Sequence, residues 1–230
     1  MGTARARVIR LAALFVAGCA AVPHGFGPPA LAGPVETGEA RAATGVGVAG
    51  DRKVFQLDAS VGANIRPWFA MTFGGTYVAL DDPHFAPIDP GQGFWPWLRP
   101  TFFLGPVSIS MVLSGFGLAG PEAAVWYGIA GLNVGIGNDH AAVYAGIRYD
   151  AAGSLGDAEF SSRQLVAGEH YDWALGKTRI GISLEGIYGE QHGEGYTAPF
   201  RGPEGTGRPF RDDETFYMVM IRVSVGWRSR

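Results

Sequence analysis

The sequence has only one cysteine, Cys19, and it lies near the N-terminus of the 230-residue chain. Everything after it lacks a thiol, which excludes a disulfide framework, a cysteine-ligated metal site and thiol catalysis there. Charged residues are also scarce, at 17% of the chain against about 25% in average soluble domains. Lys53 and Lys177 are the only lysines. This composition argues against an ordinary water-facing surface.

Long apolar runs and catalytic motifs are missing as well. After residue 40 no segment reaches the roughly 18 consecutive apolar residues of a transmembrane helix. The net charge of −3, without a basic stripe, predicts no nucleic-acid partner. The histidines do not form H-x-x-x-H or H-E-x-x-H, and neither G-x-S-x-G nor G-x-G-x-x-G before a helix occurs. We therefore expect no catalytic residues, no metal and no cofactor, and the protein is predicted not to be an enzyme.

The N-terminus has the pattern of an export signal. Three arginines between residues 5 and 10 precede an apolar segment from Leu11 to Val22. About a dozen apolar residues are too few to span a bilayer, where about 20 are needed. This segment is therefore expected to direct secretion and to be absent from the fold.

Two cleavage positions remain open. The sequence V-A-G-C that ends at Cys19 resembles a bacterial lipobox, which makes 1–18 the signal peptide and Cys19 a lipidated first residue. The alternative is ordinary cleavage after Ala32, with 1–32 as the signal peptide. Residues 19–41, rich in Gly, Pro and Ala, are expected to form a flexible tether, because they have too few large apolar side chains to fold.

Alternation of apolar and polar residues dominates the remainder, 42–230, and predicts an all-β domain. In the clearest case, 55–65, Phe55, Leu57 and Val61 alternate with Gln56, Asp58 and Ser60. Nine clear strands are predicted at 55–65, 67–80, 94–104, 106–117, 123–136, 140–150, 161–174, 177–190 and 217–227. The weaker segment 42–50 supplies a tenth, because a single-chain bacterial barrel has an even number of strands. We predict one antiparallel up-and-down β-barrel of ten strands, with eight as the alternative.

The predicted connections alternate between short and long. Tight turns are expected at 66–67, 105–106, 137–139 and 176–177, where Gly, Pro, Asn and Asp gather. Longer loops are expected at 81–93, 151–160 and 191–213. Short turns on one side and long loops on the other are typical of bacterial outer-membrane barrels, with the long loops outside the cell.

The last predicted strand, which ends at Trp227, resembles the terminal strand of small bacterial outer-membrane β-barrel proteins. It departs from their pattern because Arg228, Ser229 and Arg230 follow the aromatic residue. The resemblance covers about 42–230 and rests on the barrel pattern. It implies a location in the bacterial outer membrane, with outer-membrane lipid and the barrel-assembly machinery as partners.

The polar face of the strands predicts a charged lumen. The side chains assigned to it are Asp58, Arg99, Arg148, Asp150, Glu185 and Arg222. In a barrel of eight to ten strands, side chains nearly fill the interior, so these charges are expected to pair across a plugged lumen. The alternative is a narrow polar pore for an unidentified small solute. No specific chemistry is evident, and the predicted role is structural, envelope interaction or a narrow pore.

Aromatic residues are expected to form girdles at the two membrane interfaces. The residues assigned to them are Trp68, Phe69, Trp95, Trp97, Trp126, Tyr149, Tyr171, Trp173, Tyr188 and Trp227. In the strand at 161–174, Arg163 and Glu169 fall on one face, and His170 and Asp172 on the other. Either a bulge or an exposed upper half is expected there, because a charge that faces lipid at mid-depth is costly.

Two other functions remain open. A soluble barrel, anchored through a lipid on Cys19, would bind a small apolar ligand inside, with its apolar faces turned inward and its polar faces toward water. An outer-membrane hydrolase would need a Ser or Asp beside His84, His170 or His192 at the loop end of the barrel.

Overall fold

The computed structural model describes residues 38–49, 52–81, 91–119, 124–154, 158–196 and 209–229. The strands are β1 (Gly38–Ala49), β2 (Arg52–Arg66), β3 (Phe69–Asp81), β4 (Gly91–Leu104), β5 (Val107–Ala119), β6 (Ala124–Gly137), β7 (Ala141–Ser154), β8 (Ala158–Leu175), β9 (Thr178–Tyr196) and β10 (Pro209–Arg228). In these ranges no helix is long and apolar enough to cross a membrane. The predicted signal peptide lies outside the described residues.

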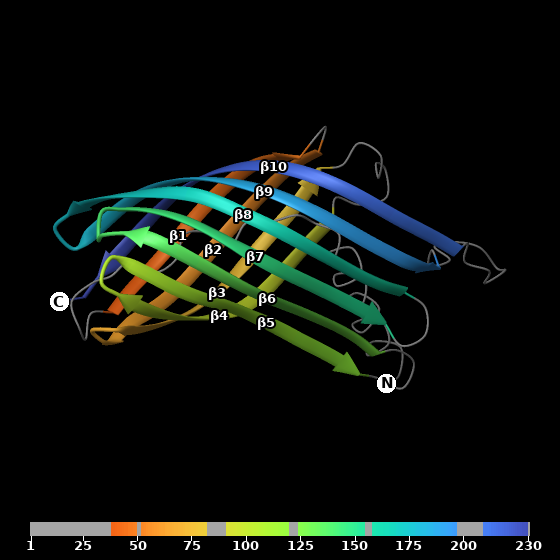
Figure 1. Ribbon diagram of the computed structural model, residues 1–230, viewed down its shortest axis with the longest axis horizontal. Helices are drawn as coiled ribbons and strands as arrows, with labels where there is room; N and C mark the ends of the chain where they lie inside the picture. The colour runs from red at the N-terminus through yellow and green to blue at the C-terminus, as the bar shows by residue number, and fades with distance from the viewer. Residues whose placement is uncertain are drawn as a thin grey trace, which may run out of the picture.

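The ten strands form one closed barrel, in which each strand pairs antiparallel with its neighbours in sequence and β1 pairs with β10 (Figure 1). Val46 lies opposite Ile221 across this closing seam and opposite Phe55 on β2. Closure removes both edge strands, so every strand has two hydrogen-bonded neighbours. The predicted all-β, ten-stranded, up-and-down barrel is confirmed.

The two ends of the barrel differ. We call the turn end the one at which the tight turns after β2, β4, β6 and β8 lie, together with the start of β1 and the end of β10. The opposite end is called the loop end. At the turn end Gly105 and Gly176 have φ values of 64° and 65°, a left-handed conformation that glycine adopts without the steric penalty of a Cβ atom. All four predicted tight turns are confirmed.

Several strands are longer than the sequence predicted. β1 begins at Gly38 and not at residue 42, because Glu39 and Ala40 already pair with Arg228 and Trp227. β7 continues to Ser154 and β8 begins at Ala158, so both strands extend into the segment expected to be a long loop. β9 and β10 likewise extend into 191–213. The strands are longer because backbone hydrogen bonding with the neighbouring strand continues beyond the residues whose apolar and polar alternation predicted the strand.

β8 is regular, so of the two alternatives expected for it, a bulge or an exposed upper half, the bulge is wrong. Its pairing with β7 and β9 runs without a register shift from Ala158 to the turn end. Because side chains alternate strictly along a regular strand, Arg163 and Glu169 face outward, while His170 and Asp172 are buried inside at 2% and 3% exposure. The only register shift recorded among the described strand pairs lies at Asn64/Arg66, between β2 and β3.

The outer face of the barrel is apolar. Tyr217, Val46 and Val219 are 70%, 60% and 56% exposed, whereas the intervening Met218 and Met220 are buried. The same alternation of exposed aliphatic and buried side chains occurs on the other strands. Apolar side chains outside and polar side chains inside is the arrangement of a membrane barrel, and it is the reverse of a water-exposed barrel that holds an apolar ligand.

Candidate functional site

The candidate site is the charged interior of the barrel. Five of the six side chains assigned to the lumen from the sequence are buried there, with exposures of 4% for Arg99, 3% for Arg148, 2% for Asp150, 0% for Glu185 and 2% for Arg222. The sixth, Asp58, is 14% exposed in its side chain and lies 3.8 Å from Arg222. The structure divides these side chains among separate clusters.

The first, which we call the Glu185 cluster, consists of Asp58, Tyr144, Glu185 and Arg222. The Arg222 guanidinium donates to both oxygens of Glu185, at 3.2 Å each. The Tyr144 hydroxyl donates to Glu185 Oε2 at 2.7 Å. Charge-assisted, two-point contact of this kind is the geometry in which a buried guanidinium and carboxylate compensate each other's loss of water.

Arg222 also joins the Glu185 cluster to the other side of the closing seam. Its Nε lies 3.8 Å from Asp58 Oδ2, although β1 separates β10 from β2. Gly45 is the residue of β1 in register with Arg222, and a Cβ at Gly45 would lie 2.7 Å from Arg222 Cγ. The missing side chain of Gly45 therefore gives Arg222 room to cross the seam. Asp58 is held on its own side by Gln56 Nε2, at 2.9 Å, and by Thr76 Oγ1, at 2.6 Å.

Arg148 and Asp150 form a second ion pair, both on β7. Arg148 donates to the two oxygens of Asp150, and Gln164 on β8 donates to Asp150 Oδ2 at 3.1 Å. Arg99 interacts electrostatically with Tyr144, Asp58 and Glu185 of the Glu185 cluster, and its guanidinium carbon lies 4.9 Å from the centroid of the Trp97 ring. A cation over an aromatic ring is stabilised by the ring quadrupole.

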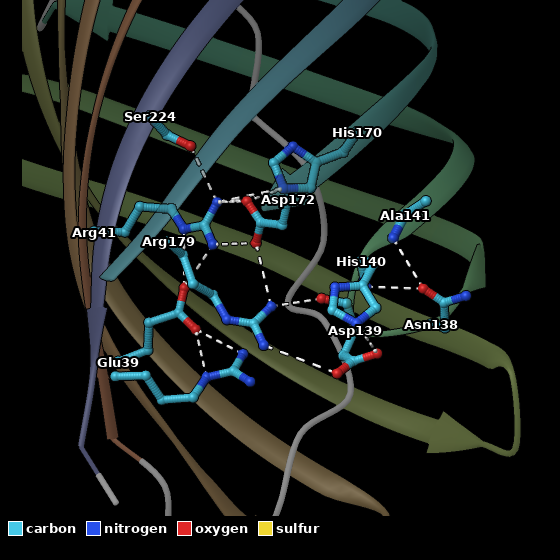
Figure 2. Close-up of polar contacts among 11 residues, drawn as sticks. Glu39, Arg41, Asn138, Asp139, His140, Ala141, His170, Asp172, Arg179 and Ser224 are labelled. Carbon is cyan, nitrogen blue, oxygen red and sulfur yellow. Dashed lines mark hydrogen bonds and ion pairs between the residues drawn. The ribbon is translucent and has the colours of Figure 1, made fainter. Parts of the chain in front are cut away.

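A further group at the turn end, which we call the Asp172 cluster, centres on Asp172 (Figure 2). Arg41 donates to both carboxylate oxygens of Asp172, and its Nη1 also donates to Ser224 Oγ at 3.1 Å. His170 Nε2 lies 3.1 Å from Asp172 Oδ1, and Arg179 Nη1 lies 3.7 Å from Oδ2. The Asp172 cluster thus connects β1, β8, β9 and β10.

Three hydrogen bonds at the rim extend the Asp172 cluster. Glu39 accepts from Arg41 Nε at 2.9 Å and from Arg228 Nη2 at 2.9 Å, next to the closing seam. Arg179 donates to the backbone oxygen of Asp139, in the turn between β6 and β7. Figure 2 shows the Glu39, Arg41, Asp172, Arg179 and Asp139 side chains lying close together.

Gly181 leaves space for the Asp172 cluster. A Cβ at this position would collide with an oxygen of Asp172 and would lie 2.6 Å from Ser224 Oγ and 2.8 Å from His170 Cε1. Any larger residue would therefore separate these three side chains.

The sequence had not indicated the Asp172 cluster. The predicted tether includes Arg41, and the mixed pattern of β8 does not show which of its two faces points inward, so neither His170 nor Asp172 is predicted to lie in the lumen. The sequence does contain a signal for the position of His170 and Asp172, because the turn at 176–177 fixes which residues of β8 and β9 share a face.

Two of the predicted girdle aromatics, Trp95 and Trp97, lie inside the barrel. Trp95 is 2% exposed, and Trp97 Nε1 donates to Thr76 Oγ1 at 3.0 Å. Both share a face of β4 with Arg99, so the alternation of that strand requires the inward position. Trp68, Tyr171, Trp173 and Trp227 do face outward, at 44–55% exposure.

Toward the loop end the interior contains both polar and apolar side chains. Asp150, Ser162 and Gln164, in the loop-end halves of β7 and β8, are 2–4% exposed. Val54, Val78 and Trp95, each near the loop end of its strand, are 0–2% exposed, and so are Met218 and Met220 on β10. Side chains with no contact to water fill the section of the lumen around them, as in a packed protein core.

The histidines named for a hydrolase do not share a location. His170 is buried near the turn end, while His192 lies in the loop-end half of β9, in register with Ser161. His84 lies outside the described residues. Within the part of the chain that the structure describes, no group of three or more His, Cys, Asp or Glu side chains is placed to hold a metal ion.

A closed antiparallel barrel with an apolar outer face, tight turns at one end and a charged, packed interior defines the class: the chain is an integral β-barrel of the bacterial outer membrane. It matches no family model and no curated protein.

Solved structures similar to this chain include the outer-membrane protease OmpT of Escherichia coli, at 7% identity and a TM-score of 0.42 over 85% of this chain and 97% of that one. The translocator domain of the autotransporter NalP from Neisseria meningitidis has 12% identity and a TM-score of 0.39 over 97% and 95%. The outer-membrane protein OmpT of Vibrio cholerae has 14% identity and a TM-score of 0.37 over 77% of this chain, which spans 56% of that protein. At these values the likenesses carry no conclusion about activity.

Proposed function

We propose that this protein is a non-conducting outer-membrane barrel with a structural or envelope-interaction role. The turn end faces the periplasm and the loop end faces the outside, in the orientation usual for this class. Insertion by the barrel-assembly machinery and contact with outer-membrane lipid belong to the same proposal.

The packed lumen is the observation that carries this proposal. Val54, Val78, Val112 and Met220, from four different strands, are 0–1% exposed, so water does not reach them. In the same interior, Glu185 and Arg222 compensate each other at 0% and 2% exposure. An aqueous channel would leave some of its lining side chains in contact with water. Paired charges packed together with apolar side chains support a plug that stabilises the barrel.

Conductance across planar bilayers tests the proposal. The purified full chain is expected to give no single-channel steps above the lipid background, and vesicles that contain it are expected not to swell in small sugars. A general porin, prepared in the same way, serves as the positive control. Reproducible conductance of the wild-type chain would contradict the closed barrel and would favour the narrow pore.

Anchoring through Cys19 is a separate part of the proposal. If the barrel itself spans the membrane, a Cys19→Ser variant is expected to stay in the outer-membrane pellet after a carbonate or urea wash and to migrate faster unheated than boiled. A soluble variant would contradict an integral barrel. A shift in the mass of the wild-type protein, absent in Cys19→Ser, would identify the lipid.

A further inference from the structure

Glu169 is a carboxylate on the apolar outer wall of the barrel. It shares a face of β8 with Leu165, Tyr171 and Trp173, which are 56%, 44% and 55% exposed. Its register partners are Val143 on β7 and Leu184 on β9, both of which face outward at 56% and 42% exposure. Aliphatic side chains therefore flank the carboxylate on both sides.

The depth of Glu169 is set by its distance from the girdle residue Trp173. Tyr171 and Trp173 are the next two residues on the same face toward the turn end, which places Glu169 about 13 Å along the strand from Trp173. At a strand tilt of about 40° this is about 10 Å of depth in an apolar band about 25 Å tall. Glu169 thus lies near the middle of the membrane, where an ionisable side chain is costly unless a partner compensates for it.

The other outward charge of β8 lies in different surroundings. Arg163 is in register with Tyr149 and Glu190, toward the loop end, where the Tyr188 hydroxyl donates to Glu190 at 3.2 Å. Tyrosines and an opposite charge are usual at a membrane interface. Interfacial surroundings therefore account for Arg163 but not for Glu169.

Among the described residues, Glu169 accepts one recorded hydrogen bond, from the Tyr171 hydroxyl at 3.4 Å. This distance is long for such a bond. The contact also means that the Tyr171 hydroxyl and the Glu169 carboxylate lie at nearly the same depth, so the Tyr171 hydroxyl lies deeper than the girdle to which the sequence assigned this residue. The outer wall therefore presents one donor and one acceptor side by side, surrounded by hydrocarbon.

The surface beside this pair is formed by small residues. Ala145, Ala167 and Gly186 lie in register across β7, β8 and β9, next to Glu169 toward the loop end. All three are exposed. A row without bulky side chains allows the backbone of another wall to approach closely.

We propose that the outer wall of β7–β9 is the interface with a second copy of this chain, in which Glu169 and Tyr171 of one copy bind the partner's Tyr171 and the partner's Glu169. Copies inserted in the same orientation are related by a two-fold axis along the membrane normal, so groups of equal depth meet. About such an axis, a donor and an acceptor at one depth can pair with the acceptor and the donor of the partner. The surrounding hydrocarbon provides no other hydrogen-bond partner for either group.

This inference rests on the membrane location of the barrel and is independent of whether the lumen conducts. Sedimentation of the purified full chain in density-matched micelles tests it. The wild type is expected to dimerise, and Tyr171→Phe, which removes only the hydroxyl, is expected to weaken association at least 10-fold. Tyr217→Phe, an exposed tyrosine on β10, is the matched control and is expected to leave association unchanged. Glu169→Gln keeps an acceptor and is expected to retain more association than Glu169→Leu.

Cross-linking in native outer membranes provides a second measurement. In a Cys19→Ser background, Ala167→Cys is expected to form a disulfide-linked dimer, whereas Val61→Cys on the β2 wall is not. Three results would overturn the interface: a wild-type chain that stays monomeric, Tyr171→Phe that associates like Tyr217→Phe, or Ala167→Cys that is captured by a different protein.

Discussion

The Glu185 cluster and the Asp172 cluster are both built from arginines and carboxylates, but they differ in contact with water. In the Glu185 cluster, the Glu185 and Arg222 side chains are 0% and 2% exposed. In the Asp172 cluster, the Asp172 side chain is 0% exposed, but the side chains of Arg41, Glu39 and Arg228 are 17%, 24% and 15% exposed. Asp172 also has three basic neighbours, Arg41, His170 and Arg179. Glu185 pairs with Arg222 and interacts electrostatically with Arg148 and Arg99 as well. Because water reaches the rim of the Asp172 cluster but not Glu185 and Arg222, we expect loss of an arginine to lower the free energy of unfolding more in the Glu185 cluster than in the Asp172 cluster.

Loss of Arg222 is expected to have the largest effect. Arg222→Met removes the two charge-assisted hydrogen bonds to the buried Glu185 carboxylate and the link to Asp58, so it should lower the free energy of unfolding by about 3–5 kcal/mol. Urea unfolding in lipid vesicles, followed by the difference in mobility between unheated and boiled protein, measures this change. The double variant Arg222→Met/Glu185→Gln should recover part of the loss. Equal losses in the single and double variants would show that the ion pair is not the cause.

Loss of Arg41 tests the tolerance of the Asp172 cluster. Arg41→Met is expected to lower the free energy of unfolding by about 2 kcal/mol, because Asp172 keeps His170 and Arg179 and the rim is reached by water. The same urea titration provides the measurement. A loss as large as that of Arg222→Met would contradict the proposed difference between the two clusters.

Gly45→Ala tests the route of Arg222 across the seam. The added Cβ would lie 2.7 Å from Arg222 Cγ and 3.3 Å from Met220 Sδ, so Arg222 must move and the expected loss is about 1 kcal/mol. Gly128→Ala is the matched control, since nothing lies within 4 Å of its added Cβ. In an Arg222→Met background the effect of Gly45→Ala should decrease. If Gly45→Ala lowered the free energy of unfolding by the same amount in the Arg222→Met background, its effect would come from the backbone of β1 and not from contact with Arg222.

The smallest effect is expected at the rim. Arg228→Gln removes the contact with Glu39, at 2.9 Å, and should cost less than about 1 kcal/mol. Added salt at about 1 M should reduce this difference, because it screens partly exposed pairs, and should leave the effect of Arg222→Met nearly unchanged. If added salt changed the effects of Arg228→Gln and Arg222→Met equally, it would contradict the proposal that the two clusters differ in their contact with water.

The sequence predicts where the strands lie and which residues face inward, because apolar and polar residues alternate along a strand that has an apolar outer face and a polar inner face. This is why the ten strands and the inward positions of residues such as Glu185 and Arg222 follow from the pattern. Where the pattern was mixed, as at Arg163, Glu169, His170 and Asp172 on β8, it did not separate a bulge from a regular strand. Pairing with β7 and β9 decides this, since a register shift would disrupt two ladders.

By itself, the sequence determined the all-β class, the ten strands, the tight turns and the apolar outer face, because each depends on residues close together along the chain. Only the tertiary structure decided which charges meet. Arg222 reaches Asp58 over Gly45, and Arg41 at the start of the barrel reaches Asp172, because closure of β1 on β10 brings distant strands together. Partners across a lumen are set by strand register and barrel curvature, which leave no trace in local alternation.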